Sequence, residues 1–223
     1  MKIKTALHVH VKGDPIDKIP YNFKELIDHA SILGFQAIAI TCHKHVFPIS
    51  KAKKYGQKKG ILIISGAEIE IENKHVIILN PAKEVLKIKT FSQLKKYKSF
   101  HKKSFIIAPH PYYPMTNCLH KKLEKNIDLF DAIEFNYFYT DLINFNKKAL
   151  KIAQKYNKPV VGTSDCHTLR VLDSTFSEIE IPNSSQLTEK LLFNAIKSNR
   201  INVITQPLSA FKCASILIEM LKM

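Results

Sequence analysis

The chain has 223 residues, enough to bury one full hydrophobic core or two small ones, and its composition is ordinary for a globular protein. Lys and Arg total 34 against 19 Asp and Glu, a net charge of +15, which fits either a polyanionic partner such as nucleic acid or a surface of solvated lysines. The lysines are scattered and only Arg170 and Arg200 can bind phosphate bidentately, which favours the solvated surface.

The cysteines and the hydrophobic segments indicate the compartment. No C-x-x-C pair occurs, so free thiols in a reducing compartment are favoured over a disulfide scaffold or a Cys-based zinc site. The N-terminus lacks the apolar core of a signal peptide. The apolar stretch at 208–223 contains Lys212 and Glu219 and is too short and too charged to span a bilayer. The sequence therefore predicts a cytoplasmic protein without membrane contact.

Short apolar strands alternate with helices in the first part of the chain. Strands are predicted at 3–10, 35–41, 61–64, 69–72 and 75–79, with helices at 22–33 and 48–60. The last two strands form a hairpin across Asn73-Lys74.

The alternation continues to the end of the chain. Further strands are predicted at 105–108, 132–135, 159–161, 178–181 and 201–204, and helices at 90–101, 121–127, 140–156 and 186–197, with a final helix after them. This order indicates an α/β fold with a mainly parallel sheet. About seven strands before residue 165 favour a closed or nearly closed barrel over a doubly wound sheet. In such barrels the chemistry lies at the C-terminal ends of the strands.

Histidines gather at those strand ends. His8 and His10 share one face of the first strand because side chains alternate along it, and a pair of surface histidines is the structural alternative. His43, His110 and His167 follow later strands, and His75 opens the return strand of the hairpin. Asp14, Glu68 and Asp165 add carboxylates at similar places, while no thiolate joins them. This donor set suits Zn²⁺, Mn²⁺ or Fe²⁺.

Nine such ligands are too many for a single ion. Two or three divalent ions a few Å apart, bridged by a carboxylate such as Glu68, would use them all. Clusters of this kind hydrolyse phosphate esters, because the ions lower the pKa of a bound water molecule and hold the phosphate oxygens. The pattern therefore indicates a metal-dependent hydrolase of phosphate esters.

Five motifs in register resemble the PHP (polymerase and histidinol phosphatase) superfamily over roughly residues 3 to 170. They are His8-Val9-His10, Thr41-Cys42-His43, Gly66-Ala67-Glu68, Pro109-His110-Pro111 and Ser164-Asp165-Cys166-His167. The resemblance implies a distorted (β/α)7 TIM-like barrel with a metal cluster at the C-terminal ends of the strands. It implies one domain over 1–223, with the barrel at about 1–170 and residues 171–223 completing or flanking it. The implied metal ligands are His8, His10, Asp14, His43, Glu68, His75, His110, Asp165 and His167.

This chain departs from the family pattern at two positions. Cys42 stands where relatives usually have Asp, and strand alternation is expected to point it away from the metals. The loop after His10 differs from the usual Ser-Asp-Gly turn, so Asp14 is the nearest match and Asp17 is its rival. Elsewhere, Glu134 either orients a ligand histidine or forms a structural ion pair.

The resemblance implies a compact phosphoesterase in which a metal-bound hydroxide attacks phosphorus. Its catalytic residues are predicted to be Asp165, His167 and Arg170, with Arg170 either holding a substrate phosphate or lying on the surface. The expected substrate is a small phosphorylated metabolite, a nucleotide or short oligonucleotide among them, and a histidinol phosphatase is the second enzymatic option. Tyr112 and Tyr113 either stack on a substrate ring or pack in the core. A non-catalytic metal-stabilised module and a nucleic-acid-binding module are the alternatives of another class.

Overall fold

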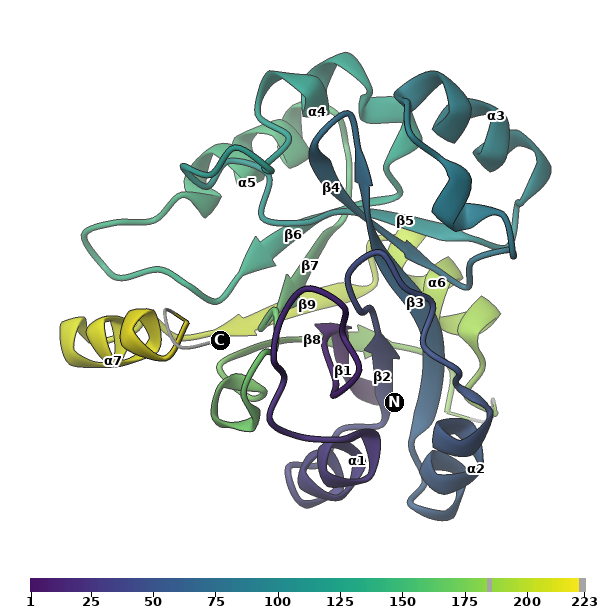
Figure 1. Cartoon of the computed structure of the whole chain (residues 1–223), viewed down its shortest axis with the longest axis vertical. Helices are drawn as coiled ribbons and strands as arrows, with labels where there is room; N and C mark the ends of the chain where they lie inside the picture. Colours follow the sequence, from purple (N-terminus) through teal and green to yellow (C-terminus); the bar gives the residue numbers. More distant parts are fainter. Residues whose placement is uncertain (184–185, 221–223) are drawn as a thin grey trace.

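The computed structural model describes residues 1–183 and 186–220, and its strands form one nine-stranded curved sheet with helices around its outside (Figure 1). Along the sheet the strands lie in the order β7, β6, β5, β4, β3, β2, β1, β8, β9. Their bounds are Lys2–Val9 (β1), Ala37–Ile40 (β2), Leu62–Ile71 (β3), Lys74–Leu79 (β4), Phe105–Ala108 (β5), Ala132–Asn136 (β6), Val160–Thr163 (β7), Thr175–Glu180 (β8) and Ile201–Thr205 (β9).

The sheet is mixed in direction. Pairing is parallel for β1–β2, β2–β3, β5–β6 and β6–β7, and antiparallel for β3–β4, β4–β5, β1–β8 and β8–β9. The predicted hairpin is present, with Ile71 opposite Lys74. The hairpin accounts for the reversed direction of β4, whereas the reversed direction of β8 was not predicted. The strands β1, β2, β3, β5, β6 and β7 still end at the same edge, and this edge carries the candidate site.

Two contacts bring the ends of the sheet together. Near the open edge, the His10 N–H donates to the Cys166 carbonyl (3.1 Å) and the Cys166 N–H to the His8 carbonyl (3.1 Å), so the segment after β7 pairs with β1. Deeper in the barrel, Ser177 Oγ of β8 accepts the Gly162 N–H of β7 (2.8 Å) and donates to its carbonyl (3.1 Å). The result is a nearly closed, distorted barrel, which confirms the predicted fold class.

Seven α-helices lie in the described part of the chain. They are α1 (Phe23–Ile32), α2 (Ser50–Lys58), α3 (Phe91–Phe100), α4 (Lys121–Lys125), α5 (Asn146–Lys155), α6 (Glu189–Lys197) and α7 (Ala210–Met220), with short 3₁₀ turns η1 (Val85–Lys87), η2 (Ile127–Leu129) and η3 (Leu169–Val171). A capping box begins α1, because Asn22 Oδ1 accepts the Glu25 N–H (3.2 Å) while Glu25 Oε2 accepts the Asn22 N–H (2.7 Å). None of the described helices is both long enough and apolar enough to cross a membrane.

The helix predicted over 140–156 begins only at Asn146. Thr140 Oγ1 accepts the Ile143 N–H (3.0 Å) and Asn144 Oδ1 accepts the Asn146 N–H (3.0 Å). Such local side-chain bonds give the backbone an alternative to the helix. The segment 137–145 is therefore a loop between β6 and α5, and Figure 1 shows it extending toward α7.

The N-terminal end of the barrel is closed by packing. Leu7, Ile64 and Ile107 are completely buried and belong to one hydrophobic cluster that also contains residues of α6. Phe193 of α6 stacks on Phe105 at the start of β5, with ring centroids 4.9 Å apart. Because this end is filled by hydrophobic side chains, polar chemistry is restricted to the opposite, C-terminal edge.

Candidate metal centre

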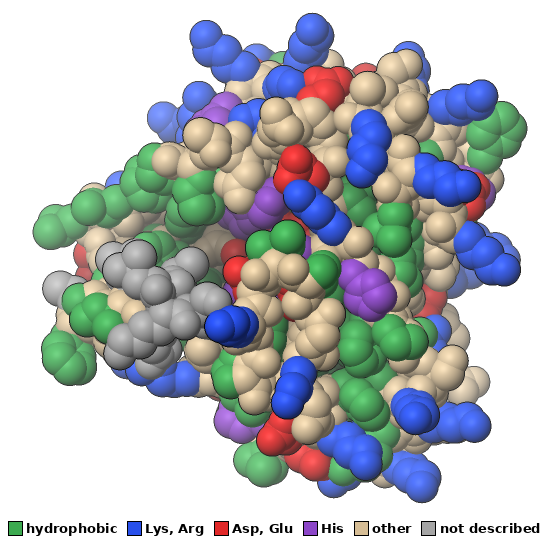
Figure 2. All heavy atoms as spheres, viewed as in Figure 1, with side chains coloured by type: hydrophobic (Ala, Val, Ile, Leu, Met, Phe, Trp, Pro, Cys, Tyr) green, Lys and Arg blue, Asp and Glu red, His purple; other side chains and the backbone are tan. Residues whose placement is uncertain are grey.

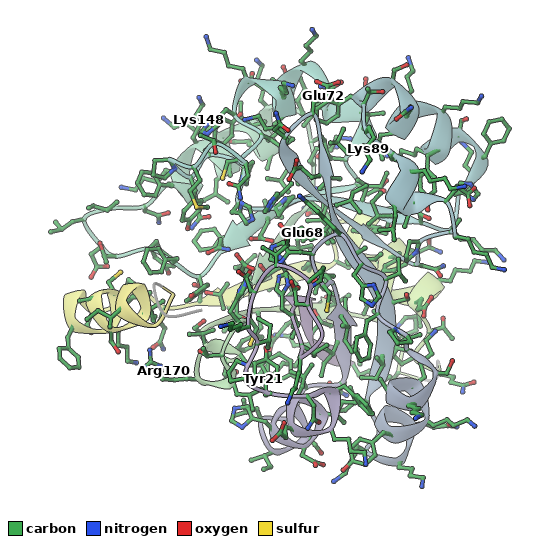
Figure 3. All side chains as sticks on the ribbon, viewed as in Figure 1. Tyr21, Glu68, Glu72, Lys89, Lys148 and Arg170 are labelled. Carbon is green, nitrogen blue, oxygen red and sulfur yellow. The ribbon has the colours of Figure 1, made fainter. Side chains whose placement is uncertain are left out.

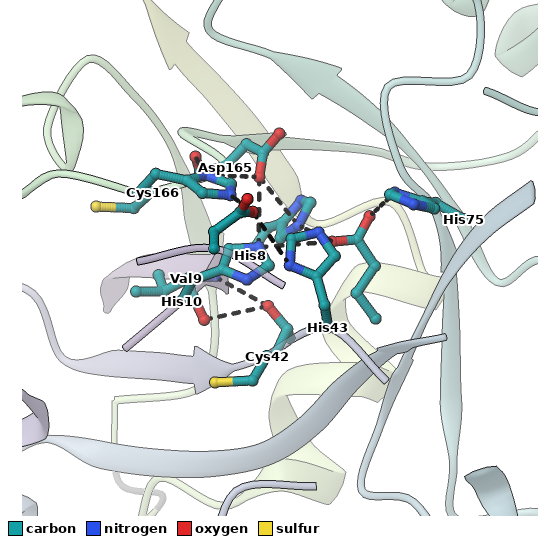
Figure 4. A network of polar contacts seen from close by, with 12 residues as sticks. His8, Val9, His10, Cys42, His43, His75, Asp165 and Cys166 are labelled. Carbon is teal, nitrogen blue, oxygen red and sulfur yellow. Dashed lines mark hydrogen bonds and ion pairs between the residues drawn. The ribbon is translucent and has the colours of Figure 1, made fainter. Parts of the chain in front are cut away.

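An irregularity in β1 aims its two histidines into the barrel. Ala6 and Val9 pack outward near α1, whereas Leu7 packs inside, and the pairing of β1 with β2 shifts register between Ala6 and Val9. Thr41 Oγ1 accepts the Val9 N–H (3.0 Å), while the Val9 carbonyl accepts both the Thr41 N–H (2.8 Å) and the Thr41 hydroxyl (3.2 Å). Such bulges re-aim side chains. His8 and His10 thus face the same space (Figure 4).

Glu68 lies at the middle of this space, and Figure 3 shows it near the centre of the molecule. Its Oε2 is 3.1 Å from His8 Nε2, 3.1 Å from His43 Nε2 and 3.5 Å from His10 Nε2. Its Oε1 is 2.7 Å from His75 Nδ1 and 3.3 Å from His110 Nε2. One carboxylate therefore faces five imidazoles from β1, β4 and the ends of β2 and β5, a geometry suited to bridging more than one ion.

Asp165 completes the centre from the end of β7. Its Oδ1 lies 3.1 Å from His8 Nε2 and 3.5 Å from both His10 Nε2 and His167 Nδ1. Its φ of 43° and that of His110, 28°, lie in the left-handed region that non-glycine residues rarely occupy. Such backbone strain is characteristic of functional sites, and here it falls on two predicted ligands.

Asp14 and Asp17 occupy different layers of the site. Asp14 has a completely buried carboxylate that lies 2.8 Å from His10 Nδ1 and accepts the His43 backbone N–H (2.8 Å). It thus contacts the His10 nitrogen that faces away from Glu68. Asp17 Oδ2 lies 3.1 Å from His167 Nε2 and 3.4 Å from His43 Nδ1, with its side chain 30% exposed. The rival position, rather than the nearest sequence match, thus faces the open side of the centre.

Other side chains hold the outer nitrogens of the histidines. Glu134 Oε2 on β6 lies 2.9 Å from His8 Nδ1, and Asn136 Nδ2 donates to Glu134 Oε1 (2.9 Å). Glu134 thus contacts a predicted ligand instead of forming an ion pair elsewhere. Histidine ligands commonly have such partners on the nitrogen opposite the metal.

Two further residues that contact the outer nitrogens of ligand histidines were not predicted from the sequence. Asn117 Nδ2 lies 3.2 Å from His75 Nε2, and Cys118 Sγ lies 3.3 Å from His110 Nδ1. The two residues are adjacent in the loop between β5 and α4 and reach histidines from two different strands. Their position could have indicated this role, because both residues lie within eight residues of His110 in a segment without regular secondary structure.

The donor atoms fit divalent metal ions. Among the described residues, four groups of three side chains each bring their ligand atoms within 4.8 Å of one another. The groups are His10 with His43 and His167, His8 with His10 and Asp165, His43 with Glu68 and His75, and Asp14 with Asp17 and His43. His10 Nε2 and Asp165 Oδ1 are buried and make no hydrogen bond of good geometry. Unpartnered buried donors of this kind are costly unless an ion or another ligand satisfies them.

The histidine and carboxylate side chains of the centre shift one another's pKa. Burial opposes protonation of His43, but Glu68 and Asp14 raise its pKa to about 10. Burial likewise opposes ionisation of Glu68, yet His75, His8 and His43 hold its pKa well below the usual value. His43 is therefore protonated at neutral pH, so metal binding to it is expected to release a proton.

The cysteines beside the ligands are not part of the donor set. Figure 4 shows the sulfur atoms of Cys42 and Cys166 pointing away from the histidines. Burial raises the pKa of the Cys42 thiol to about 11 and that of Cys166 to about 12. Protonated thiols directed outward are neither ligands nor nucleophiles, in agreement with the expectation for Cys42.

Arg170 lies outside the centre. It is an exposed residue of η3 whose Nη1 donates to Ser215 Oγ of α7 (3.2 Å), and Figure 3 shows it at the edge of the molecule below α7. The structure therefore does not bring this arginine together with the predicted ligands, in contrast to Asp165 and His167.

Known structures share this architecture. PsfC from Pseudomonas syringae PB-5123 has a TM-score of 0.68 at 17% identity and covers 99% of this chain and 97% of that chain. A two-domain protein of Bacteroides vulgatus ATCC 8482, described as containing a PHP-like metal-dependent phosphoesterase, has a TM-score of 0.67 at 18% identity, with coverages of 99% and 70%. Endonuclease Q, in complex with a 27-mer duplex bearing an abasic lesion, has a TM-score of 0.67 at 15% identity, with coverages of 89% and 57%. At these identities the likeness shows the fold alone.

A family-level match identifies the family to which the chain belongs, which structural likeness at these identities does not. No curated protein matches the chain. The PHP domain family matches residues 7–166, and the PHP-associated family matches residues 144–201. The first match contains every predicted ligand except His167 and spans well over half of the sequence, so the chain belongs to the PHP domain family.

Proposed function

We propose that this chain is a metal-dependent phosphoesterase that hydrolyses a phosphate ester of a small metabolite, nucleotides included. The observation that carries the proposal is the convergence of five imidazoles on one buried carboxylate, Glu68, at the open end of the barrel. The residues that would hold two or three ions of zinc, manganese or iron are His8, His10, Asp17, His43, Glu68, His75, His110, Asp165 and His167. Asp14, the nearest sequence match, is assigned to orienting His10 and His43.

The protein's own groups define where the reaction takes place. Divalent ions bound there would supply polarisation of the phosphate and a lowered pKa for the attacking water. Asp165 Oδ1 makes no hydrogen bond of good geometry although it lies 3.1 Å from His8 Nε2, and it can accept a hydrogen bond from that water molecule. His167 serves as a ligand through Nε2 or, in a two-ion centre, as the acid that protonates the leaving oxygen, because Asp165 O anchors its Nδ1 at 2.8 Å. Arg170 is left out of this mechanism, since it bonds to Ser215.

The test is phosphate release by protein reconstituted with Mn²⁺, Zn²⁺ or Fe²⁺ from a panel of phosphorylated metabolites, histidinol phosphate among them. His8→Ala is expected to lower kcat/KM about a thousandfold, since metal ions contribute several kcal/mol to such reactions. His29→Ala, on the outer helix α1, is the matched control and should retain activity. Wild-type protein that binds metal but releases no phosphate from any member of the panel would favour the non-catalytic alternative.

A polynucleotide substrate is the second candidate. The net charge of +15 and the structural likeness to endonuclease Q, which is seen bound to duplex DNA, favour it. Against it, Figure 2 shows Lys and Arg side chains dispersed over the face of the molecule and not gathered along one groove.

We also propose that the chain forms a single domain, since β8 and β9 pair into the same sheet as the other strands. A cytoplasmic location is proposed because all four cysteines are free.

A further inference from the structure

A cavity of about 250 Å³ opens directly beside the candidate metal centre. His110, Asp165 and His167 line both the cavity and the centre. Figure 2 shows the surface hollowed between the β6–α5 loop and α7, with hydrophobic side chains along the rim. A phosphate held at the centre would therefore direct its ester group into this cavity.

Aromatic rings form much of the wall. Tyr113 and Phe145 are in contact, with ring centroids 5.3 Å apart, as are Tyr137 and Phe138 at 5.9 Å. These four rings come from the loop after β5 and the loop between β6 and α5, and Ile216 of α7 adds an aliphatic contact. Because α5 begins only at Asn146, Phe145 remains in the loop that borders the cavity and contributes its ring to the wall.

The side-chain amide of Asn136 and the hydroxyl of Tyr113, two polar groups of the wall, already bond within the protein. Asn136 Nδ2 donates to Glu134 and Asp165, while Asn136 Oδ1 accepts the Phe138 N–H (3.0 Å). The Tyr113 hydroxyl donates to the Phe138 carbonyl (2.8 Å). Among the lining residues that the structure describes, none is Lys or Arg. The wall therefore favours a flat, uncharged group bound by stacking over a sugar or a second phosphate bound by polar contacts.

We propose that this cavity binds an aromatic ring of nucleobase size, so that the substrate is a phosphate monoester or diester of a small ring-bearing molecule. The inference rests on the proposed phosphoesterase function for the position of the phosphate. The volume lies just below the ~300 Å³ at which pockets begin to take drug-sized ligands, and it accommodates one ring system. Because stacking accepts any π-face, the cavity selects for the presence of a ring more than for one particular base.

The experiment compares adenosine 5′-monophosphate with ribose 5-phosphate, which carries a hydroxyl at the sugar carbon where the nucleotide carries adenine. With Mn²⁺-loaded protein, kcat/KM is expected to be about ten- to a hundredfold higher for the nucleotide, the range that stacking of one base provides. Phe145→Leu keeps an apolar side chain, and at 37% exposure the position tolerates the change. This variant should lower kcat/KM for the nucleotide alone. Phe100→Leu, on α3 and 72% exposed, is the matched control and should alter neither substrate.

A binding measurement separates this inference from the proposed function. Calorimetry should detect adenosine but not ribose with wild-type protein, and Phe145→Leu should weaken adenosine binding by about tenfold or more. If no phosphate ester is hydrolysed but adenosine still binds in this way, the phosphoesterase proposal fails and the ring site stands. Equal kcat/KM for the two phosphates, or equal loss on both in Phe145→Leu, would overturn the ring site while leaving the phosphoesterase intact. Absence of adenosine binding would overturn it as well.

Discussion

At the scale of single residues, the two aspartates after β1 divide the work of the site. Asp14 is buried against His10 Nδ1 and the His43 backbone, whereas Asp17 faces His43 and His167 on the open side. Motif spacing favoured Asp14 because it measures distance along the chain. The turn at residues 11–17 decides where each carboxylate points, and spacing does not encode that turn. We propose Asp17 as the ligand and Asp14 as the orienting group.

Asparagine substitutions separate the two roles. Asp17→Asn removes the proposed ligand and is expected to lower the number of ions bound per chain by one. Asp14→Asn leaves the ligand set intact and should weaken metal affinity about ten- to a hundredfold, as loss of an orienting partner does. Elemental analysis gives the stoichiometry, and competition with a chelator gives the affinity. Loss of an ion in Asp14→Asn with full occupancy in Asp17→Asn would reverse the assignment.

Asn117 provides a second test at this scale. Its side-chain amide contacts His75 Nε2, while His75 Nδ1 faces Glu68. Asn117→Ala should therefore weaken metal binding about tenfold without a change in the number of ions bound. Asn183→Ala, on the exposed segment after β8, offers a control of the same chemistry remote from the centre. An affinity equal to wild type in Asn117→Ala would show that the contact does not orient His75.

At the scale of elements, sequence periodicity predicted most strands and helices within a few residues. The strand predicted at 105–108 has the same bounds in the structure. Most of the predicted ligand histidines lie at or just after strand ends, as expected. The bulge in β1 and the loop before α5 were not predicted. Both depend on side-chain to backbone bonds, from Thr41 and Thr140, that a hydrophobic pattern does not register.

Closure of the barrel depends on a close approach of β7 and β8. A Cβ at position 162 would lie 2.7 Å from the Phe176 carbonyl oxygen and 2.7 Å from Val203 Cγ1. Gly162→Ala should therefore lower the free energy of unfolding by about 1–3 kcal/mol, since backbone must move to admit the methyl group. Ser177→Ala leaves the Gly162 N–H and carbonyl without their partner and should cost about 1–3 kcal/mol. Chemical denaturation measures both, and unchanged stability in both variants would refute this account of closure.

At the scale of the whole molecule, the lysine excess forms no single basic patch on the face that Figure 2 shows. The composition did not exclude a polyanionic binding partner, because net charge carries no information on where the charges lie. The space-filling view shows the cations spread among other side chains. The charge is therefore assigned to solubility and general attraction of anions.

This assignment predicts weak and uniform binding of nucleic acid. Fluorescence anisotropy with a labelled 20-mer, single-stranded or duplex, should give a Kd no tighter than about 10⁻⁶ M at physiological salt, the range of non-specific binding. Hydrolysis of a small phosphate ester should vary little over the same salt range. Nanomolar binding with a steep salt dependence would instead support the nucleic-acid alternative.

The central claim is that residues from distant parts of the chain form one polynuclear metal centre around Glu68. The most direct measurement is the metal content of purified protein, after reconstitution with Mn²⁺, Zn²⁺ or Fe²⁺ and gel filtration, compared with Glu68→Gln. We expect about two or three ions per chain in the wild type and loss of at least one in the variant, because Glu68 is proposed to bridge several ions. A wild-type protein that retains no divalent metal, or a Glu68→Gln variant that retains the full complement, would contradict it.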